Sequence, residues 1–193
     1  MHSKSADKLF LVAIPSGKLL SVAQSIQAKL NEKYRLYSPL NIPPLHVTID
    51  HLLIGSEDDY NLATELIQRV CDKTPVFDLT VKGFSFFHYP HKSINLYVEK
   101  TMKLKELADE IHTLLDEAGL STRPHYAQWE FHISLLNTVF ASRTWCEEEF
   151  IEAQNYVKNW GLDLTCKIEW LELWKPKYEP QLIIEDFFPL KGN

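Results

Sequence analysis

The chain has 193 residues, of which 45% are hydrophobic, and its 26 acidic and 20 basic side chains give a net charge of -6 and a pI near 5.7. This length suits one globular domain or two small lobes with a real hydrophobic core. The acidic balance disfavours a large surface for duplex nucleic acid, which would need a basic face, so we expect no duplex DNA partner. A local basic pocket for a small nucleotide or a strand end is compatible with it.

The cysteines and the N-terminal residues predict a cytoplasmic protein. Cys71, Cys146 and Cys166 are odd in number and lack CxxC spacing, so they indicate neither a disulfide framework nor a zinc knuckle. Residues 1–8 are polar and lack the apolar core of a signal peptide. The apolar run over 9–14 is far too short to span a bilayer, so we expect no membrane partner.

The first half of the chain predicts an alternation of strands and helices. Apolar runs or strict alternation indicate strands, and apolar residues at intervals of three or four indicate helices. Ser56 is a candidate helix cap, because the acidic residues that follow it suit the positive end of a helix dipole. The predicted elements are a strand over 9–14, a helix over 19–30, a strand over 46–54, a helix over 56–70 and a strand over 77–87.

The second half predicts the same order. Gly119 is placed to cap the C-terminus of one helix, and Thr144 with Glu147 is a capping box in front of the next. The predicted elements are a strand over 94–98, a helix over 104–118, a strand over 130–135, a helix over 144–160, and strands over 162–174 and 182–188.

Equivalent points of the two halves are separated by a nearly constant number of residues. The separation is 85 residues between the first strands of the halves and 86 residues between His46 and His132. We therefore predict an internal duplication with an approximate repeat over 8–88 and 93–188. Pseudo-twofold symmetry between the two units would bring equivalent strands together across a central cleft.

Each half contains one motif of a histidine, an apolar residue, a hydroxyl residue and another apolar residue. The motifs are His46-Val47-Thr48-Ile49 and His132-Ile133-Ser134-Leu135. Side chains alternate between the faces of a strand, so the imidazole and the hydroxyl of each motif share one face, about 7 Å apart. Such a pair can reach neighbouring oxygens of one phosphate. A further match, His91-Lys92-Ser93, has a charged middle residue and follows Pro90, so we interpret it as a turn leading into a strand.

The two motifs, in a repeated chain of this length, resemble the 2H phosphoesterase superfamily, the group that contains the 2′,5′ RNA ligase-like cyclic phosphodiesterases. The resemblance implies an α+β fold with two pseudo-symmetric lobes, each a mostly antiparallel sheet flanked by helices, around a central cleft. It implies that residues 1–193 form a single bilobal domain. It also implies that His46 and His132 are catalytic, that Thr48 and Ser134 bind phosphate, and that no metal or other cofactor is needed.

Two histidines suit the opening of a cyclic phosphodiester. Histidine, with an ordinary pKa near 6.5, can be neutral or protonated around neutral pH. A neutral imidazole would deprotonate the attacking water and a protonated one would protonate the departing sugar oxygen, each transfer contributing about 10²- to 10⁴-fold. Thr48 and Ser134 would donate hydrogen bonds to the non-bridging oxygens. Which histidine is the base stays open, and the two roles would exchange in the reverse, ligating direction.

The resemblance implies a metal-independent phosphodiesterase that acts on 2′,3′-cyclic phosphates, 2′,5′-linked RNA ends or small cyclic nucleotides, and we expect a monomer. The alternative is a nucleotide or RNA-end binding module without turnover. A third hypothesis is a metal hydrolase that uses His46, His132 and a carboxylate, but His-x-His, His-x-Asp and HExxH motifs are missing from the sequence. P-loop and Rossmann glycine patterns are missing too.

The loop before the second motif is a candidate substrate-binding segment. We expect it at the cleft mouth, with Arg123 on a phosphate and Tyr126 or Trp129 stacked on a base. Aromatic residues in front of a strand can equally close a core, so that alternative stays open.

Four further residues have structural interpretations. Asp50 shares the face of His46 in a regular strand, where a carboxylate can orient an imidazole, but we interpret it as a solvated carboxylate at the strand end. His51 is interpreted as structural. Trp170 and Trp174, in the late strand, are interpreted as packing residues.

Overall fold

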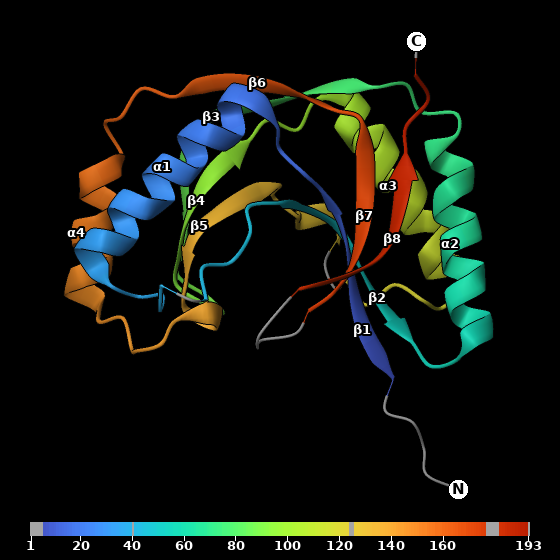
Figure 1. Cartoon of the computed structure of the whole chain (residues 1–193), viewed down its shortest axis with the longest axis horizontal. Helices are drawn as coiled ribbons and strands as arrows, with labels where there is room; N and C mark the ends of the chain where they lie inside the picture. The colour runs from blue at the N-terminus through green and yellow to red at the C-terminus, as the bar shows by residue number, and fades with distance from the viewer. Residues whose placement is uncertain (1–5, 40, 124–125, 177–181, 193) are drawn as a thin grey trace, which may run out of the picture.

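A computed structural model describes residues 6–39, 41–123, 126–176 and 182–192. The first five positions of the polar N-terminal segment, and two positions of the predicted substrate loop, lie outside these ranges. The elements, drawn in Figure 1, are β1 (Asp7–Ala13), α1 (Gly17–Tyr34), β2 (Val47–Ile54), α2 (Glu57–Cys71), β3 (Phe77–Phe87), β4 (Ser93–Val98), α3 (Met102–Glu117), η1 (Tyr126–Gln128), β5 (His132–Asn137), η2 (Thr138–Phe140), α4 (Glu147–Val157), β6 (Asp163–Ile168), β7 (Trp170–Lys175) and β8 (Ile183–Pro189).

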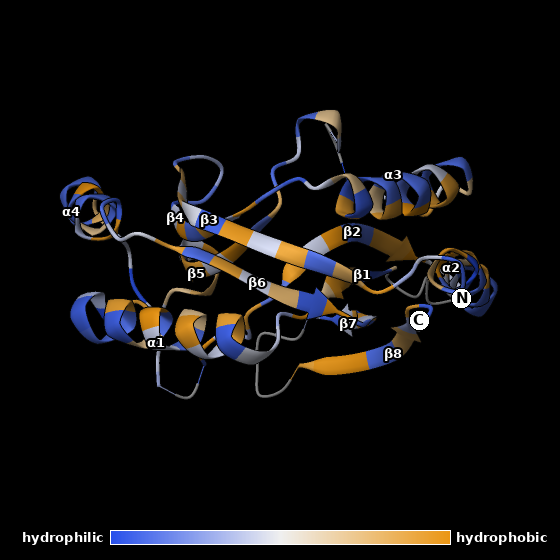
Figure 2. Cartoon of the chain, turned by 90° about the horizontal axis from the view of Figure 1, so that it is seen from above, coloured by the Kyte–Doolittle hydropathy of each residue, from blue (hydrophilic) through white to orange (hydrophobic). Residues whose placement is uncertain are grey.

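All eight strands belong to one curled sheet with the order β6-β3-β4-β5-β2-β1-β7-β8. Every neighbouring pair of strands in it is antiparallel. Helices α1 and α4 lie beside one half of the sheet, and α2 and α3 lie beside the other (Figures 1 and 2). The predicted α+β class, with mostly antiparallel strands flanked by helices, is confirmed.

Each half of the sheet takes strands from both halves of the chain. Strand β3 follows α2 in the sequence but pairs with β4, and β7 pairs with β1. The order of strand, helix, motif strand, helix and strand does occur twice, as predicted. Because the last strand of the first copy is exchanged in this way, the two halves of the sheet are tied together by crossing segments of chain.

Two predicted boundaries are wrong. Helix α4 begins at Glu147 with Cys146 as its N-cap residue, and the Glu149 carboxylate accepts a hydrogen bond from the Cys146 amide at 3.4 Å, so the capping box is not at Thr144. The strand predicted over 162–174 is two strands, β6 and β7, separated at Glu169. The break is needed because β6 pairs with β3 and β7 pairs with β1, at opposite ends of the sheet.

The core lies between the sheet and the helices that cover it. Leu19 and Leu30 of α1 and Ile67 of α2 are fully buried against it, and burial of each such side chain stabilises the fold by about 1.5–3 kcal/mol. In Figure 2 the helices show hydrophobic and hydrophilic residues on different sides. None of the helices in the described part of the chain is long and apolar enough to cross a membrane.

Candidate active site

The two motifs lie at the centre of the sheet. Strands β2 and β5 are neighbours, and the residues that pair between them are Val47 and Ile133, both 0% exposed. Side chains alternate along a strand, so the histidine and the hydroxyl residue that flank each of these apolar residues point to the opposite face. All four of those polar side chains are half-buried, which leaves them accessible on that face.

The antiparallel register brings the motifs together. Extending it by one residue on each side of Val47 and Ile133 sets His46 opposite Ser134 and Thr48 opposite His132. The two histidines are then diagonal neighbours, whose Cα atoms lie roughly 7–8 Å apart in such a pair. Two imidazoles and two hydroxyls therefore surround one point.

The imidazoles are held in the same tautomer by equivalent hydrogen bonds. Nδ1 of His46 lies 2.8 Å from the carbonyl oxygen of Pro44, and Nδ1 of His132 lies 2.8 Å from that of Glu130. A carbonyl oxygen can only accept, so Nδ1 is the protonated nitrogen in both rings. This leaves each Nε2 available to take up a proton or, once protonated, to donate one.

An aromatic ring fixes each imidazole from the side. The His46 ring meets Trp174 of β7 edge-on, with centroids 4.7 Å apart, and the His132 ring meets Phe87 of β3 in the same way, also at 4.7 Å. Strands β7 and β3 occupy equivalent places in the two halves of the sheet. Each ring is thus oriented by one carbonyl and one aromatic side chain.

Burial favours the neutral form of both histidines. It lowers the pKa of His46 below its ordinary value, and it lowers the pKa of His132 to about 4, where the nearby His46 and Arg123 charges add to the effect. The carbonyl hydrogen bonds at Nδ1 oppose this shift only in part. At neutral pH the free protein presents two neutral imidazoles, and a bound anion would favour protonation of one of them.

The two hydroxyls have different surroundings. Ser134 Oγ donates a hydrogen bond to Oδ1 of Asn95 at 3.0 Å, and the fully buried Asn95 amide donates in turn to Ser93 Oγ at 3.0 Å. Thr48 is paired with Val12 of β1 instead, and its hydroxyl has no hydrogen bond to any of the residues that the structure describes. The Thr48 hydroxyl is therefore free to donate to a ligand.

Arg123 does not lie where we predicted it. Its side chain is 4% exposed, and its guanidinium donates to the backbone carbonyl of Thr48 at 3.4 Å and to that of Ile49. It also stacks on Trp129, with Cζ 3.5 Å from the ring centroid. Burial lowers the pKa of Arg123 to about 10. These contacts show that the guanidinium supports strand β2, and we do not assign it a role in binding the phosphate of a substrate.

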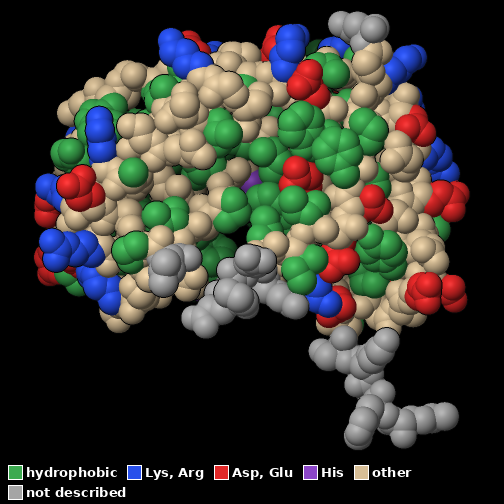
Figure 3. Space-filling view, viewed as in Figure 1, with side chains coloured by type: hydrophobic (Ala, Val, Ile, Leu, Met, Phe, Trp, Pro, Cys, Tyr) green, Lys and Arg blue, Asp and Glu red, His purple; other side chains and the backbone are tan. Residues whose placement is uncertain are grey.

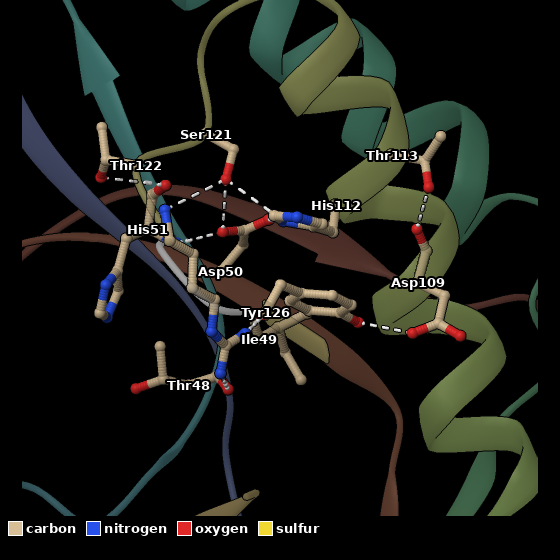
Figure 4. A network of polar contacts seen from close by, with 11 residues as sticks. Thr48, Ile49, Asp50, His51, Asp109, His112, Thr113, Ser121, Thr122 and Tyr126 are labelled. Carbon is tan, nitrogen blue, oxygen red and sulfur yellow. Dashed lines mark hydrogen bonds and ion pairs between the residues drawn. The ribbon is translucent and has the colours of Figure 1, made fainter. Parts of the chain in front are cut away.

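The other two residues of the predicted substrate loop, Tyr126 and Trp129, contact different parts of the protein. Tyr126 stacks on His112 with centroids 3.8 Å apart and donates its hydroxyl to Asp109 at 2.8 Å, so its ring is committed to helix α3 (Figure 4). Trp129 is half-buried, and its ring stacks on the guanidinium of Arg123 and lies 6.0 Å from the ring of His132. Of the three side chains, Trp129 contacts a motif residue.

A bulge in β2 overturns our interpretation of Asp50. The register with β1 shifts, because Val12 pairs with Thr48 while Leu11 pairs with Asp50, so Ile49 is an extra residue. Asp50 consequently turns towards helix α3 and is 0% exposed, not solvated.

The buried Asp50 carboxylate is held by a polar network. Oδ2 lies 2.9 Å from Nδ1 of His112, and Oδ1 accepts from Ser121 Oγ at 3.1 Å (Figure 4). Ser121 Oγ lies 3.2 Å from the same Nδ1. A catalytic triad needs the nucleophile at the other imidazole nitrogen, so this network ties β2 to α3 and is not a hydrolase triad.

The bulge also brings a third histidine near the motifs. The His51 ring lies 4.6 Å from Phe10 and 5.8 Å from Trp129, a neighbour of His132. Burial, aided by the charge of Arg123, lowers the pKa of His51 to about 3, so it is neutral at pH 7. Alternation alone does not reveal a bulge, so the sequence contained no signal for this placement.

A surface cavity of about 540 Å³ has none of the four motif residues in its lining. Its lining includes His88, Lys92 and Arg143. Its cations already have carboxylate partners, since Lys92 pairs with Glu147 and Arg143 pairs with Glu149, both at 2.8 Å. We therefore place the candidate site at the motifs and not at this cavity. In the described ranges, no three His, Cys, Asp or Glu side chains are grouped so that they could hold a metal ion.

Comparison with known proteins places the chain in a family. The model of the 2′-5′ RNA ligase superfamily matches residues 15–177. A putative phosphoesterase of Geobacillus thermodenitrificans is 28% identical over 106 residues, which are 55% of this chain and 58% of that protein. The chain thus spans less than two thirds of the length of this curated relative.

Solved structures share the fold. The protein TT0787 of Thermus thermophilus superposes with a TM-score of 0.72 at 16% identity, over 96% of this chain and 98% of that one. Escherichia coli LigT in its apo form superposes with a TM-score of 0.64 at 18% identity, over 97% and 99%. With the family match over most of its length, the chain belongs to the 2′-5′ RNA ligase superfamily, among the 2H phosphoesterases.

Proposed function

We propose that the protein is a metal-independent phosphodiesterase that opens 2′,3′-cyclic phosphates or cleaves 2′,5′ linkages at RNA ends or in small nucleotides. Membership of a phosphoesterase and ligase-like family supports this reaction class. The observation that carries the proposal is the pair of equivalent Nδ1 hydrogen bonds, which direct His46 Nε2 and His132 Nε2 towards proton transfer on one face of the sheet.

The reaction would use one histidine on each side of the phosphorus. Nε2 of the neutral imidazole takes a proton from water as the water oxygen forms a bond to phosphorus. Nε2 of the protonated imidazole gives its proton to the departing sugar oxygen as the P–O bond breaks, and the product is a nucleoside monophosphate. Thr48 would donate a hydrogen bond to a non-bridging oxygen where negative charge accumulates, and Ser134 lies opposite on the same face. In the reverse of this step, microscopic reversibility requires the two histidines to exchange roles.

Small nucleotides are the substrate class that the relatives support. Crystal structures of Escherichia coli LigT, which shares the fold, hold 3′-AMP, phosphate, NADP+ or ATP. A nucleoside 3′- or 2′-monophosphate is the product expected here. All four motif residues come from one chain, so we expect the monomer to be active.

The test is release of nucleoside monophosphate from 2′,3′-cyclic nucleotides and from 2′,5′-linked dinucleotides, with and without EDTA. We expect turnover that survives the chelator and is lost in His46→Ala and in His132→Ala. A binding module would give affinity without product. Turnover that needs a metal, or that persists in a folded single-histidine variant, would contradict the proposal.

A further inference from the structure

A row of side chains on β7 continues the site away from His46. Trp174 contacts the His46 ring at 4.7 Å, so it lies on the motif face. Glu172 and Trp170, two and four residues earlier, share that face, and at about 3.3 Å per residue they lie roughly 7 and 13 Å further along the strand. Trp174 is 4% exposed, whereas Glu172 and Trp170 are half-buried. The row therefore becomes more accessible with distance from the histidine.

The two indoles fix the carboxylate between them. Nε1 of Trp170 donates to Oε1 of Glu172 at 3.0 Å, and Nε1 of Trp174 donates to Oε2 at 2.7 Å. A carboxylate offers about four acceptor positions, so about two remain for a ligand. Since each oxygen already has one donor, its rotamer is set before a ligand arrives, and the cost of ordering the side chain on binding is low.

An exposed aromatic ring lies directly across from this carboxylate. Phe187 of the edge strand β8 is paired with Glu172, and its ring lies 5.6 Å from that of Trp170 at an interplanar angle of 30°. Phe187 is 50% exposed. Figure 3 shows hydrophobic side chains and a carboxylate together on this face, beside a histidine, over the region where Figure 1 draws β7 and β8.

We infer that Trp170, Glu172 and Phe187 form the nucleobase subsite of the proposed phosphodiesterase, and that it selects guanine. The inference rests on the proposed function, because it assumes that the sugar phosphate lies between His46 and His132. An exposed aromatic platform stacks any base, and a row that starts at His46 leads from the phosphate to the base.

The carboxylate decides which base is preferred. Glu172 can only accept hydrogen bonds. Guanine presents two adjacent donors, N1–H and the N2 amino group, which match the two carboxylate oxygens. Adenine and cytosine present one amino donor next to a ring nitrogen that accepts, and uracil presents one N–H between two carbonyls, so each sets an acceptor against a carboxylate oxygen. Each good bidentate contact discriminates well against the wrong base.

The first experiment compares the four 2′,3′-cyclic nucleotides with the wild-type protein. We expect kcat/KM for the guanosine compound to exceed that for each of the others by at least about tenfold, as one bidentate contact provides. Equal values for all four bases, or a preference for adenine, would overturn the assignment.

Variants separate stacking from hydrogen bonding. Phe187→Ala should raise KM for every base, by about five- to a hundredfold, with kcat nearly unchanged, because base stacking is lost. Glu172→Gln should reduce the preference for guanosine over uridine to near unity, through a loss of about tenfold or more in kcat/KM for the guanosine compound. Ile151→Ala, a change to a 46% exposed apolar residue on α4, is the matched control and should leave all KM values unchanged. An unchanged KM in Phe187→Ala would contradict the proposal that the Phe187 ring stacks on the base.

Equilibrium binding keeps this inference separate from the proposed reaction. Calorimetry with 3′-GMP and 3′-AMP needs no turnover, and we expect 3′-GMP to bind at least about tenfold more tightly in wild type, with this ratio lost in Glu172→Gln. If the protein hydrolyses no cyclic nucleotide but shows this ratio, the proposed reaction fails and the base subsite stands. Equal affinities for 3′-GMP and 3′-AMP together with normal turnover would support the proposed reaction and contradict the proposed base subsite.

Discussion

The β2 half and the β5 half of the candidate site hold their histidines in the same way and differ in what surrounds their hydroxyls. Both histidines bond a carbonyl two residues earlier through Nδ1 at 2.8 Å, and both meet an aromatic ring at 4.7 Å. The hydroxyls differ, since Ser134 is bonded to the buried Asn95 while Thr48 is paired with the apolar Val12. The proposed proton transfer would constrain where Nε2 lies, whereas several kinds of packing can hold a strand in place.

The strands that carry the motifs also differ in regularity. Strand β2 contains a bulge at Ile49, whose carbonyl is satisfied by the buried Arg123. Strand β5 has a register shift of its own against β4, between Ile94 and Asn95. The two motif strands therefore depart from a regular ladder at different places and against different neighbours.

The largest expected effect tests the shared part of the two halves. His46→Ala and His132→Ala should each lower kcat on 2′,3′-cyclic nucleotides by about 10²- to 10⁴-fold, because each removes one proton transfer. The double variant should be hardly worse than either single variant, since the two groups act as a unit. His91→Ala is the control, because His91 belongs to the further match His91-Lys92-Ser93 that we interpret as a turn, and this variant should keep full activity. If the loss of kcat at one histidine were tenfold smaller than at the other, the two histidines would not have equivalent roles.

The next effect tests the hydroxyls, where the two halves differ. Thr48→Ala should lower kcat by about 10²-fold, because its free hydroxyl can donate to the developing charge. Ser134→Ala should cost less, about tenfold, since its hydroxyl hydrogen is engaged by Asn95. Steady-state kinetics of both variants decide the order, and equal losses would show that Ser134 changes its hydrogen bond when substrate binds.

Stability measurements test the support of β2. Arg123→Leu should lower the free energy of unfolding by about 2–3 kcal/mol, because carbonyls of the bulged strand lose their buried donor. Urea unfolding followed by fluorescence measures this change. Arg69→Leu, at an exposed position of α2, is the matched control and should change the free energy of unfolding by less than about 0.5 kcal/mol. A small effect at Arg123 would mean that water can replace the guanidinium.

The smallest effect is a pH dependence of stability. The pKa of His51 is lowered to about 3 and that of His132 to about 4, so the unfolded chain binds protons below pH 6.5 while the folded chain does not. Their contribution to stability is complete above pH 6.5 and is lost as the pH falls towards 4. Between pH 7.5 and 5, His51→Asn should reduce the fall in the free energy of unfolding by about 2 kcal/mol. His91→Asn, at an exposed position, should leave the fall unchanged.

Local pattern was enough for the motifs and for most elements. The alternation around His46 and His132 put each imidazole beside a hydroxyl on one face, and the helical spacing of apolar residues located four helices to within a few residues. These features depend on the geometry of a single strand or helix. The break at Glu169 was missed, because an unbroken apolar pattern does not reveal that two strands pair at opposite ends of a sheet.

Which side chains share a face could be read from the order of residues, because alternation is a property of a single extended segment. The folded chain was needed to establish that β3 pairs with β4 and β7 with β1, that Asp50 turns towards α3, and that Arg123 is buried. Strand partners and bulges depend on free-energy differences between distant segments, and a long cation such as Arg123 can lie in solvent or across a strand with the same local pattern. Folding selects between those alternatives by satisfying buried polar groups.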